Sequence, residues 1–407
     1  MTLTECKIDL LKYGVTFSPI SLFNDIDKKV YKLKLLNKMP KTIGNQVFDE
    51  SNQNDMIPAE ILLEQNGHQS LTKLRYSVDS PLKISFDGEN LELSNNGKPV
   101  DINCSLVKYN PVLQEKIPSD VSKRGFSVGD YVSVVGLNRV TVLFYDGCYN
   151  WLTCKNCKFC DLHPVRKTDA VARPTVNDLY KYDSIKAWWD DQKLEYINCV
   201  KYSLKKVLDS FDNNDLQIFF MAGNLENNVQ TWQIALDVVG EISKDIDLSK
   251  YVNYVNIAPH DTLENVEKIK NMSINNVQYN LEVSTKKLFE DYCPGKMNYD
   301  MFLSKMVEAT SVMGMGHVRS NFVLGLEDTN ALLKFADEYG KMGIVVDYSV
   351  FQPKKGTPLC NHPTLDFDKV IEFSKKLCEI YKKYNQKPIF SPVSSRSSIM
   401  NELYMEI

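Results

Sequence analysis

The chain has 407 residues, of which 43% are hydrophobic and 25% are charged, and its formal net charge is −4. This composition is typical of an ordinary soluble globular protein. The small net charge gives no electrostatic reason to expect binding to nucleic acid or to an anionic membrane. No apolar run approaches the roughly eighteen residues that cross a bilayer. The first residues lack the basic and apolar regions of a signal peptide, and clustered free thiols fit a reducing compartment, so we expect a cytoplasmic protein.

Residues 1–125 differ in pattern from the rest of the chain. Short apolar segments, such as residues 82–86, alternate with the turn signals Asp87-Gly88 and Asn95-Asn96-Gly97. We predict a small, mostly β N-terminal module. It acts either as a cap on the main domain or in substrate recognition.

From about residue 131 onwards, strand-like apolar runs alternate with helical patterns. The expected strands are residues 140–145, 216–221, 254–257, 276–281, 318–324 and 344–351. The expected helices are residues 183–211, 229–242, 301–313, 330–342 and 366–384. Such alternation indicates parallel βαβ units, so the predicted class is α/β with a partial (β/α)6, TIM-like barrel. The expected domains are residues 1–125, a core barrel over 126–360 and a C-terminal helical extension over 361–407.

Four of the ten cysteines, Cys148, Cys154, Cys157 and Cys160, lie just after the first of these strands. In α/β barrels this end of a strand is where catalytic groups are placed. Thiols this close cannot all form unstrained disulfides, and they suit a shared metal centre, either an iron–sulfur cluster or structural zinc. A zinc ribbon needs a second CxxC pair about fifteen to twenty residues further on, and none follows Cys160.

This cysteine segment resembles the signature of the radical S-adenosylmethionine (SAM) superfamily, CxxxCxxC with an aromatic residue before the last cysteine. Cys157, Phe159 and Cys160 match its second half, but the first cysteine is missing from its usual place. The third ligand is then Cys148 or Cys154, and Cys148 is favoured because it follows the strand closely. A different register, Cys148, Cys154 and Cys157, is similar to the methanogen proteins that help to build the iron–guanylylpyridinol cofactor of [Fe]-hydrogenase.

In the favoured register, the loop between the first two ligands bulges outwards. Cys154 then stays a free thiol, and Trp151 and Leu152 are expected to pack beneath the cluster. His163 follows the cysteine loop, and a histidine in such a place is more often a neighbouring or surface residue than a ligand.

The resemblance implies a [4Fe–4S] cluster and SAM as cofactors, with three thiolates leaving one iron open. It implies reductive cleavage of SAM to a 5′-deoxyadenosyl radical that abstracts hydrogen from a small-molecule or peptide substrate. It also implies an electron donor such as flavodoxin or ferredoxin. The expected pathway is cofactor biosynthesis, perhaps of the guanylylpyridinol type. The alternative is a non-catalytic zinc-binding interaction protein, in which all four cysteines close a tetrahedral site.

Two further strand ends carry residues that fit a SAM site. Gly223 and Asn224 follow the second expected strand, where radical SAM enzymes bind the amino group of SAM. Asn280, Glu282 and Ser284 follow the fourth and resemble the Asn-Leu-acid-x-Ser segment of the biotin synthase branch, which holds the SAM ribose. Glu282 can accept hydrogen bonds from both ribose hydroxyls. The simpler interpretation is that Ser284 or its neighbour caps the next helix.

The fifth expected strand also resembles the biotin synthase branch, in which a glycine-bearing turn lines the adenine. Gly325 and Leu326 are the candidates for that contact. Arg319 lies in an otherwise largely apolar strand, and a buried arginine needs an anion. This anion is a carboxylate of SAM or substrate, or a structural partner such as Glu282 or Glu308.

The run Lys-Gly-Thr-Pro-Leu at residues 355–359 resembles the same branch. Arg319 stands where a cysteine of the second biotin synthase cluster is expected. The sequence therefore does not favour sulfur insertion.

Overall fold

A computed structural model describes residues 1–18, 20–27, 29–35, 55–86, 90–162, 172–211, 215–354 and 356–407. His163, Lys355 and the expected turn at Asp87-Gly88 lie outside this range. The chain divides into two compact units. Unit 1 comprises Met1–Tyr109, Val323–Leu333 and Tyr348–Ile407, and unit 2 comprises Asn110–Phe322 and Lys334–Asp347. The boundaries between these units do not fall at residues 125 and 360, and the three expected domains stay a prediction.

Unit 1 contains a sheet with the strand order β1-β6-β7-β9-β4-β5, in which β8 pairs with β7. The strands are β1 (Thr16–Phe17), β4 (Glu60–Gln65), β5 (His68–Lys73), β6 (Leu82–Phe86), β7 (Leu91–Asn95), β8 (Lys98–Pro99) and β9 (Asn103–Leu106). A two-stranded antiparallel sheet joins β2 (Leu33–Leu35) to β3 (Met56–Pro58). Alternate apolar residues along β4 and β6 are fully buried, as expected of sheets with one face on a core.

Three helices of unit 1 are α1 (Leu3–Tyr13), α10 (Phe367–Lys383) and α11 (Met400–Met405). Helix α1 begins with a capping box, in which Thr2 and Glu5 exchange backbone and side-chain hydrogen bonds. A fully buried ion pair links α1 to α11: Lys7 Nζ lies 2.7 Å from Glu402 Oε1. Ser70 also donates to the same oxygen of this carboxylate, so two donors stabilise the buried charge at Oε1.

The second large sheet lies mostly in unit 2 and has the order β10-β11-β12-β13-β14-β15-β16. Its strands are β10 (Val132–Val135), β11 (Arg139–Leu143), β12 (Gln217–Met221), β13 (Val252–Asn256), β14 (Asn276–Gln278), β15 (Val318–Leu324) and β16 (Ile344–Val350). Strand β10 is antiparallel to β11, and the pairs from β11 to β15 are parallel. The protein is thus mixed α/β, and all six expected strands are present. Closure into a partial barrel stays a prediction.

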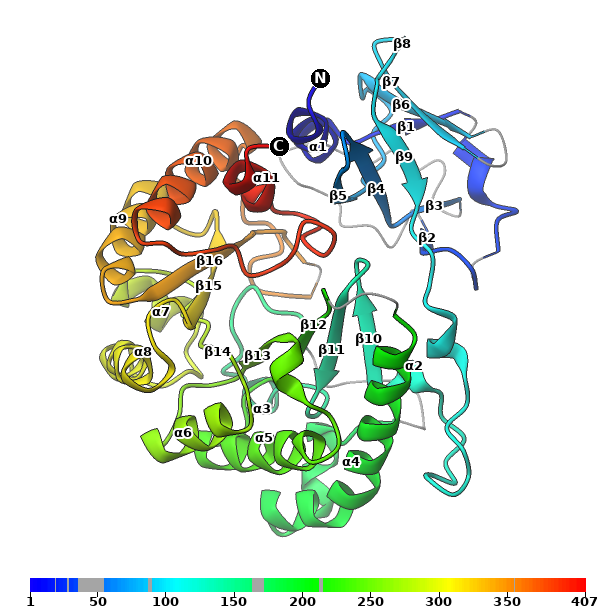
Figure 1. Cartoon of the computed structure of the whole chain (residues 1–407). Helices are drawn as coiled ribbons and strands as arrows, with labels where there is room; N and C mark the ends of the chain where they lie inside the picture. The colour runs from blue at the N-terminus through cyan, green and yellow to red at the C-terminus, as the bar shows by residue number, and fades with distance from the viewer. Residues whose placement is uncertain are drawn as a thin grey trace. The chain divides into compact units, whose positions relative to one another are not determined.

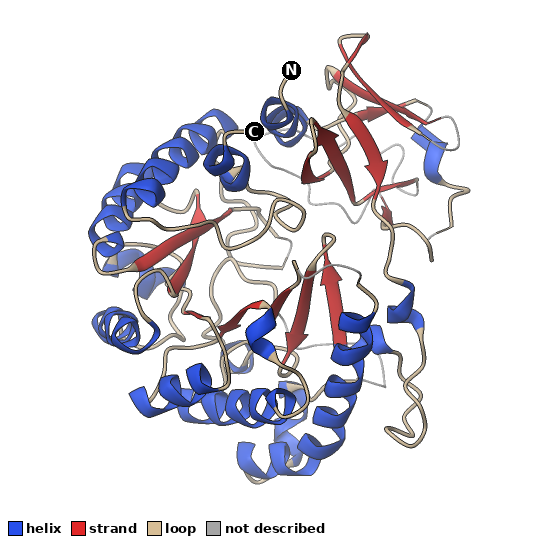
Figure 2. Cartoon of the chain, viewed as in Figure 1, coloured by secondary structure: helices blue, strands red, loops and turns tan. Residues whose placement is uncertain are grey.

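The remaining α-helices follow the strands along the chain. They are α2 (Val128–Tyr131), α3 (Tyr149–Leu152), α4 (Ile185–Asp209), α5 (Asn228–Ser243), α6 (Leu263–Asn271), α7 (Lys286–Tyr292), α8 (Tyr299–Met313) and α9 (Thr329–Gly340). Helices α4, α5, α6 and α8 lie on one side of the strands of unit 2 (Figures 1 and 2). None of the helices in the described ranges is long and apolar enough to cross a membrane.

Parallel strands place their carboxyl ends at one edge of the sheet. The cysteine loop after β11, the turn after β12 and the segment after β14 therefore meet at this edge. Strand β14 ends at Gln278 rather than at residue 281. Beyond Gln278 the pairing with β15 becomes irregular: Tyr279 N–H still donates to the carbonyl of Arg319 at 2.9 Å, and Glu282, which has a positive φ of 75°, forms an isolated parallel bridge with Phe322.

Candidate functional site

A cavity of about 540 Å³ lies in unit 2 at the carboxyl ends of β11, β12 and β13. Eight of the predicted site residues line it: Cys148, Cys157, Phe159, Cys160, Gly223, Asn224, Asn280 and Glu282. They come from three separate loops, so the fold brings together what the sequence only placed at strand ends. Among the described residues, the lining does not include Cys154, Ser284 or Arg319.

Three thiols converge in this cavity. Asn224 N–H donates to Cys148 Sγ at 3.4 Å, and Leu162 N–H donates to Cys160 Sγ at 3.5 Å. Burial raises the pKa of Cys148 and raises that of Cys160 to about 12, and repulsion from Cys157 adds to both shifts. Thiols with raised pKa values stay protonated unless a bound cation stabilises the thiolates, as a metal centre does.

Cys157 also has a partner that the sequence analysis did not identify. A hydrogen bond with Cys293, followed by burial, raises the pKa of Cys157 well above its usual value. Cys293 lies at the end of α7. In addition, Lys158 N–H donates to the carbonyl of Tyr292 at 2.9 Å. The turn after α7 thus packs directly on the cysteine loop.

Cys154 differs from the other three cysteines of the loop because it is exposed and lies outside the cavity lining. Among the residues that the structure describes, no group of three His, Cys, Asp or Glu could hold a single metal ion. A cubane takes each thiolate on a different iron, so its ligands are spaced more widely than around one ion. Cys154 does not share the cavity of the other three cysteines, as a four-cysteine zinc site would require.

The segment between Cys148 and Cys157 was expected to bulge outwards. It instead forms the short helix α3, and Leu152 is 45% exposed. Neither Trp151 nor Leu152 lines the cavity, and the expectation that they pack beneath the centre stays a prediction.

Gly223 is required where β12 meets the cysteine loop. A Cβ at this position would lie 2.4 Å from the carbonyl oxygen of Gly147 and 2.8 Å from Cys148 Cβ. Its neighbour Asn224 accepts a hydrogen bond from Tyr149 N–H at 2.8 Å. Only glycine permits so close an approach, so Gly223 fixes the position of Cys148 relative to the next strand.

Glu282 forms an ion pair that the sequence analysis missed. Lys296 Nζ lies 2.8 Å from Glu282 Oε1, and each side chain is only 12% exposed. Burial raises the pKa of Glu282, although Lys296 opposes this shift. Burial acts to lower the pKa of Lys296, but the neighbouring Glu282 carboxylate more than offsets this effect, so that the pKa is raised. Lys296 therefore places one positive charge between the carboxylate and the thiols.

Backbone geometry holds Glu282 in place. Its φ of 75° is in the left-handed region, which is unusual for a residue other than glycine, and its N–H donates to Asn321 O at 3.2 Å. The side-chain oxygen of Asn280 accepts from Gln278 Nε2 at 2.9 Å and from Asn321 N–H at 3.3 Å. Strained backbone that neighbours enforce is common at functional sites.

Ser284 is buried, and its carbonyl accepts a hydrogen bond from Tyr299 Oη. The following helix, α7, has Thr285 as its N-cap residue, but this side chain makes no capping hydrogen bond. Thr285 therefore does not cap α7 through its side chain, and both the capping role and the ribose contact of Ser284 stay predictions.

Arg319 has a partner other than those predicted. Its Nε and one terminal nitrogen each lie 2.8 Å from an oxygen of Asp347 on β16. The two side chains are 5% and 9% exposed. This bidentate geometry is the strongest form of an arginine–carboxylate pair. The predicted structural partners Glu282 and Glu308 were wrong, and Arg319 does not line the described part of the cavity.

Gly325 and Leu326 belong to unit 1, whereas the cavity belongs to unit 2. Gly325 has a φ of 109°, which an L residue rarely adopts. Leu326 is 5% exposed. The adenine contact expected of these two residues stays a prediction.

A buried histidine also lines the cavity, at the end of the segment that follows β13. His260 Nδ1 lies 3.3 Å from Tyr279 Oη, and its Nε2 lies 3.4 Å from Glu308 Oε2. Burial and the charge of Lys305 lower the pKa of His260, against the opposing effect of Glu308. We missed it because a lone histidine after a strand carries no recognisable spacing.

No protein-family model matches the chain. A curated relative, the bacteriochlorophyllide c C-7(1)-hydroxylase of Chlorobaculum limnaeum, is 29% identical over 136 residues. The match covers 32% of this chain and 34% of the relative, so the chain spans about a third of that protein.

Two solved structures are similar to the chain at a low level. The FeFe-hydrogenase maturase HydG from Carboxydothermus hydrogenoformans has 17% identity and a TM-score of 0.40, over 64% of this chain and 53% of HydG. Methylornithine synthase (PylB) has 12% identity and a TM-score of 0.41, over 64% of this chain and 65% of the synthase.

Radical SAM enzymes use a [4Fe–4S] cluster and SAM, and the chain offers residues that fit both. Three half-buried thiols with raised pKa values line one cavity, which is the donor set that a cluster with one open iron needs. Beside them lies a carboxylate already paired with a buried lysine. The cavity also contains polar groups at several strand ends, which a ligand with both charged and hydroxyl groups requires.

Proposed function

We propose that the chain is a radical SAM enzyme that holds a [4Fe–4S] cluster through Cys148, Cys157 and Cys160. The observation that carries this proposal is the convergence of these three thiols on one cavity with the Glu282–Lys296 pair. When bound, the reduced cluster supplies the electron that cleaves the sulfonium bond of SAM.

The residues of the chain would bind and orient SAM. Asn224 and Gly223 lie beside Cys148 and suit the amino group of SAM. Asn280 and Glu282 suit its ribose. Lys296 opposes the rise in the Glu282 pKa that burial causes, which favours a carboxylate that accepts hydrogen bonds from the ribose.

Other parts of the proposal rest on the resemblance. They are the adenine contact of Gly325 and Leu326, a small-molecule or peptide substrate and an electron donor such as flavodoxin or ferredoxin. For the pathway, we propose cofactor biosynthesis, supported by a relative that is named for hydroxylating bacteriochlorophyllide c. The guanylylpyridinol type is less well supported, because its cysteine register needs Cys154, which is exposed.

The test is anaerobic purification, reconstitution with iron and sulfide, and incubation with dithionite and SAM. We expect a brown protein with about four irons per chain, as a cubane requires, and release of 5′-deoxyadenosine and methionine. A colourless protein that holds only zinc and leaves SAM intact would refute the proposal and favour the zinc-binding alternative.

A further inference from the structure

Unit 1 gathers five basic side chains around one carboxylate, that of Glu60. They are Lys32, Lys34, Lys73, Lys354 and Arg396. Lys73 and Glu60 are paired across β4 and β5, so their side chains point to the same face of the sheet. Lys73 N–H also donates to the carbonyl of Arg396 at 2.9 Å, which brings the loop before α11 to the end of β5.

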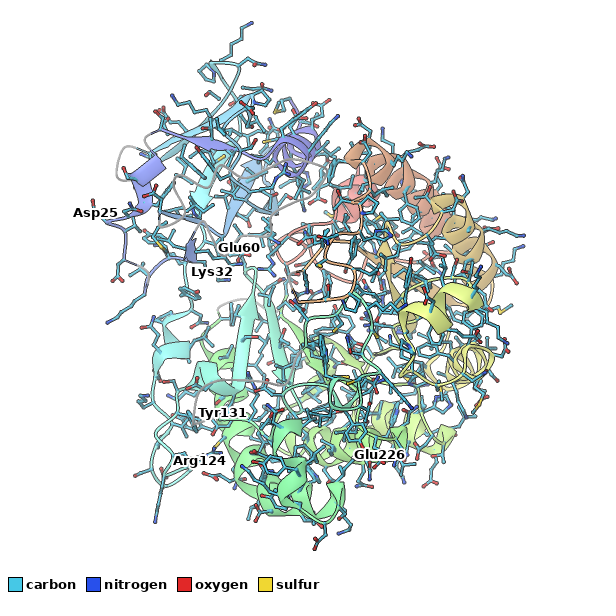
Figure 3. The ribbon with its side chains drawn as sticks, turned by 180° about the vertical axis from the view of Figure 1, so that it is seen from behind. Asp25, Lys32, Glu60, Arg124, Tyr131 and Glu226 are labelled. Carbon is cyan, nitrogen blue, oxygen red and sulfur yellow. The ribbon has the colours of Figure 1, made fainter. Side chains whose placement is uncertain are left out.

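Both oxygens of the Glu60 carboxylate are already used. Lys32 Nζ lies 3.1 Å from Oε1, and the Arg396 guanidinium lies 3.1 Å from Oε2. Figure 3 labels Lys32 and Glu60, which contribute to this contact. The Glu60 side chain is 2% exposed. The Glu60 carboxylate is therefore already shared by Lys32 and Arg396 before Lys73 is considered.

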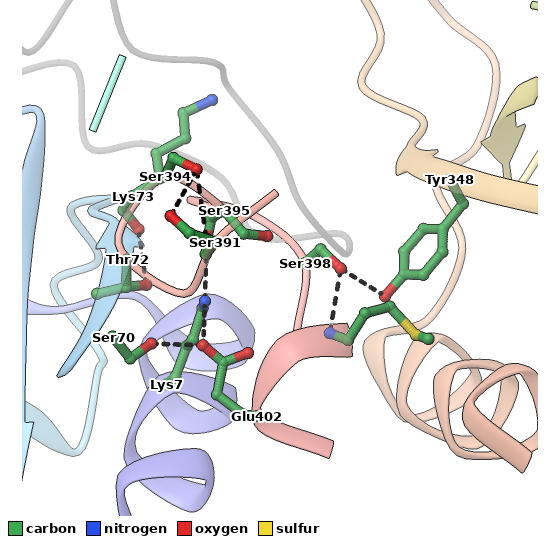
Figure 4. A network of polar contacts seen from close by, with 11 residues as sticks. Lys7, Ser70, Thr72, Lys73, Tyr348, Ser391, Ser394, Ser395, Ser398 and Glu402 are labelled. Atoms are coloured by element: carbon green, nitrogen blue, oxygen red, sulfur yellow. Dashed lines mark hydrogen bonds and ion pairs between the residues drawn. The ribbon is translucent and has the colours of Figure 1, made fainter. Parts of the chain in front are cut away.

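Lys73 has no carboxylate partner among the described residues. Its ammonium group donates to the neutral Gln352 side chain at 3.4 Å. Figure 4 shows the chain of Lys73 extending away from the Lys7–Glu402 network, past Ser394. Burial and repulsion from Lys34, Arg396 and Lys354 together lower the pKa of Lys73 to about 7. A cation in such surroundings is costly unless an anion joins it.

We propose that this cluster binds a small, multiply charged oxyanion, that is, a ligand with phosphate or several carboxylate groups. Lys73 and Arg396 would contact it directly. Arginine holds such groups through two parallel hydrogen bonds, and lysine adds a point charge.

The size of the ligand follows from burial. Glu60 and Lys32 are buried and Lys73 is half-buried, whereas Arg396 is 36% exposed and Lys354 is exposed. Among the described residues, the members of the cluster most exposed to solvent are thus Arg396 and Lys354. A nucleic acid or a membrane surface would need an exposed basic face, but a small anion does not. The proposal does not depend on the radical SAM chemistry.

The experiment titrates the full-length protein with pyrophosphate, inorganic phosphate or citrate at constant ionic strength, by calorimetry and by thermal unfolding. The variants are Lys73→Gln and Arg396→Gln. The control is Lys376→Gln, because Lys376 is an exposed lysine of unit 1 that pairs with Glu372 on α10. Each contact variant should weaken binding roughly ten- to a hundredfold, the usual value of a charge-assisted hydrogen bond. The control should bind like the wild type.

The three anions separate the possible sources of the ligand. Preference for phosphate or pyrophosphate indicates a phosphate ester, and preference for citrate indicates a polycarboxylate. A second measurement uses the wild type alone: an amine-acylating reagent should modify Lys73 rapidly near pH 8, and the preferred anion should slow this reaction. No saturable binding of any of the three anions, or equal binding by all variants, would overturn the proposal.

Discussion

Gly295 and Lys155 approach each other so closely that a Cβ on Gly295 would lie 2.4 Å from the carbonyl oxygen of Lys155. The same Cβ would lie 2.5 Å from Asn150 Cγ. Real Cβ atoms do not approach backbone oxygens this closely, so only glycine allows the turn after α7 to pack on the cysteine loop. Lys296 and Cys293 lie in that turn, and it is therefore this contact that positions the cation and the additional thiol beside Cys157.

We predict that Gly295→Ala will lower cluster occupancy and SAM turnover at least tenfold, because the turn must move away from the cysteine loop. The measurement is iron per chain after reconstitution, together with 5′-deoxyadenosine formation. Gly240→Ala is the control, because a Cβ there meets only the flexible end of Met272 at 3.3 Å, and alanine favours helices. Normal iron content in Gly295→Ala would show that the close packing is not needed.

The second prediction concerns the cysteine ligands. Replacing Cys148, Cys157 or Cys160 with serine should abolish the visible spectrum of the cluster and SAM cleavage, because these three thiols share the cavity. Cys154→Ser is the matched control and should keep both, since Cys154 is exposed. A bleached Cys154→Ser protein would instead favour a register that includes Cys154.

The third prediction separates SAM binding from cluster assembly. Glu282→Gln should weaken SAM binding roughly ten- to a hundredfold and leave the spectrum of the cluster unchanged. The charge lost at Glu282 lies beside Lys296 rather than on a cysteine. Equilibrium binding to the reconstituted protein gives the affinity. Glu241→Gln, which changes an exposed pair with Lys244, should bind SAM normally; equal affinity in both variants would exclude the ribose role of Glu282.

The contacts that sequence analysis recovered were local ones. The six strands were predicted because each is a short apolar run between turns, and three thiols were grouped because they are close along the chain. Lys296 lies beyond a whole helix from Glu282, and no periodic pattern links the two. The partner of Arg319 was missed for a similar reason: Asp347 lies on the neighbouring strand, and the register between parallel strands cannot be derived from either strand alone.

The fourth prediction tests whether Arg319 serves structure rather than SAM. Arg319→Met removes the bidentate arginine partner of the buried Asp347 carboxylate, a loss that typically costs about 3–5 kcal/mol of unfolding free energy. Adding Asp347→Leu in the same chain should recover most of this loss, because both buried charges are then gone. Denaturant unfolding measures each variant. A double variant as unstable as Arg319→Met, or one that unfolds normally but no longer binds SAM, would contradict the structural role.

The last prediction concerns the pH dependence of stability that Lys73 causes. Its pKa is lowered from 10.5 to about 7 in the folded protein, so between these values the unfolded chain binds more protons than the folded one. Stability therefore rises with pH across this window, by at most about 1.4 kcal/mol per pH unit from this group. Below pH 7 the lysine is protonated in both states, and its contribution no longer changes with pH.

Lys73→Gln removes this proton-linked contribution, while the buried cysteines that titrate in the same window remain in both proteins. The difference in unfolding free energy between wild type and variant should therefore change with pH between about 7 and 10.5. Besides burial, the positive charges of Lys34, Arg396 and Lys354 lower the pKa of Lys73. The Glu60 carboxylate is already paired with Lys32 and Arg396. Bound pyrophosphate should make this difference depend less on pH, since an anion beside Lys73 raises the pKa of the lysine again. Denaturant titrations in chloride buffer at several pH values measure the unfolding free energy of the two proteins. If the two free energies change with pH in parallel, Lys73 is not held in a repulsive cluster.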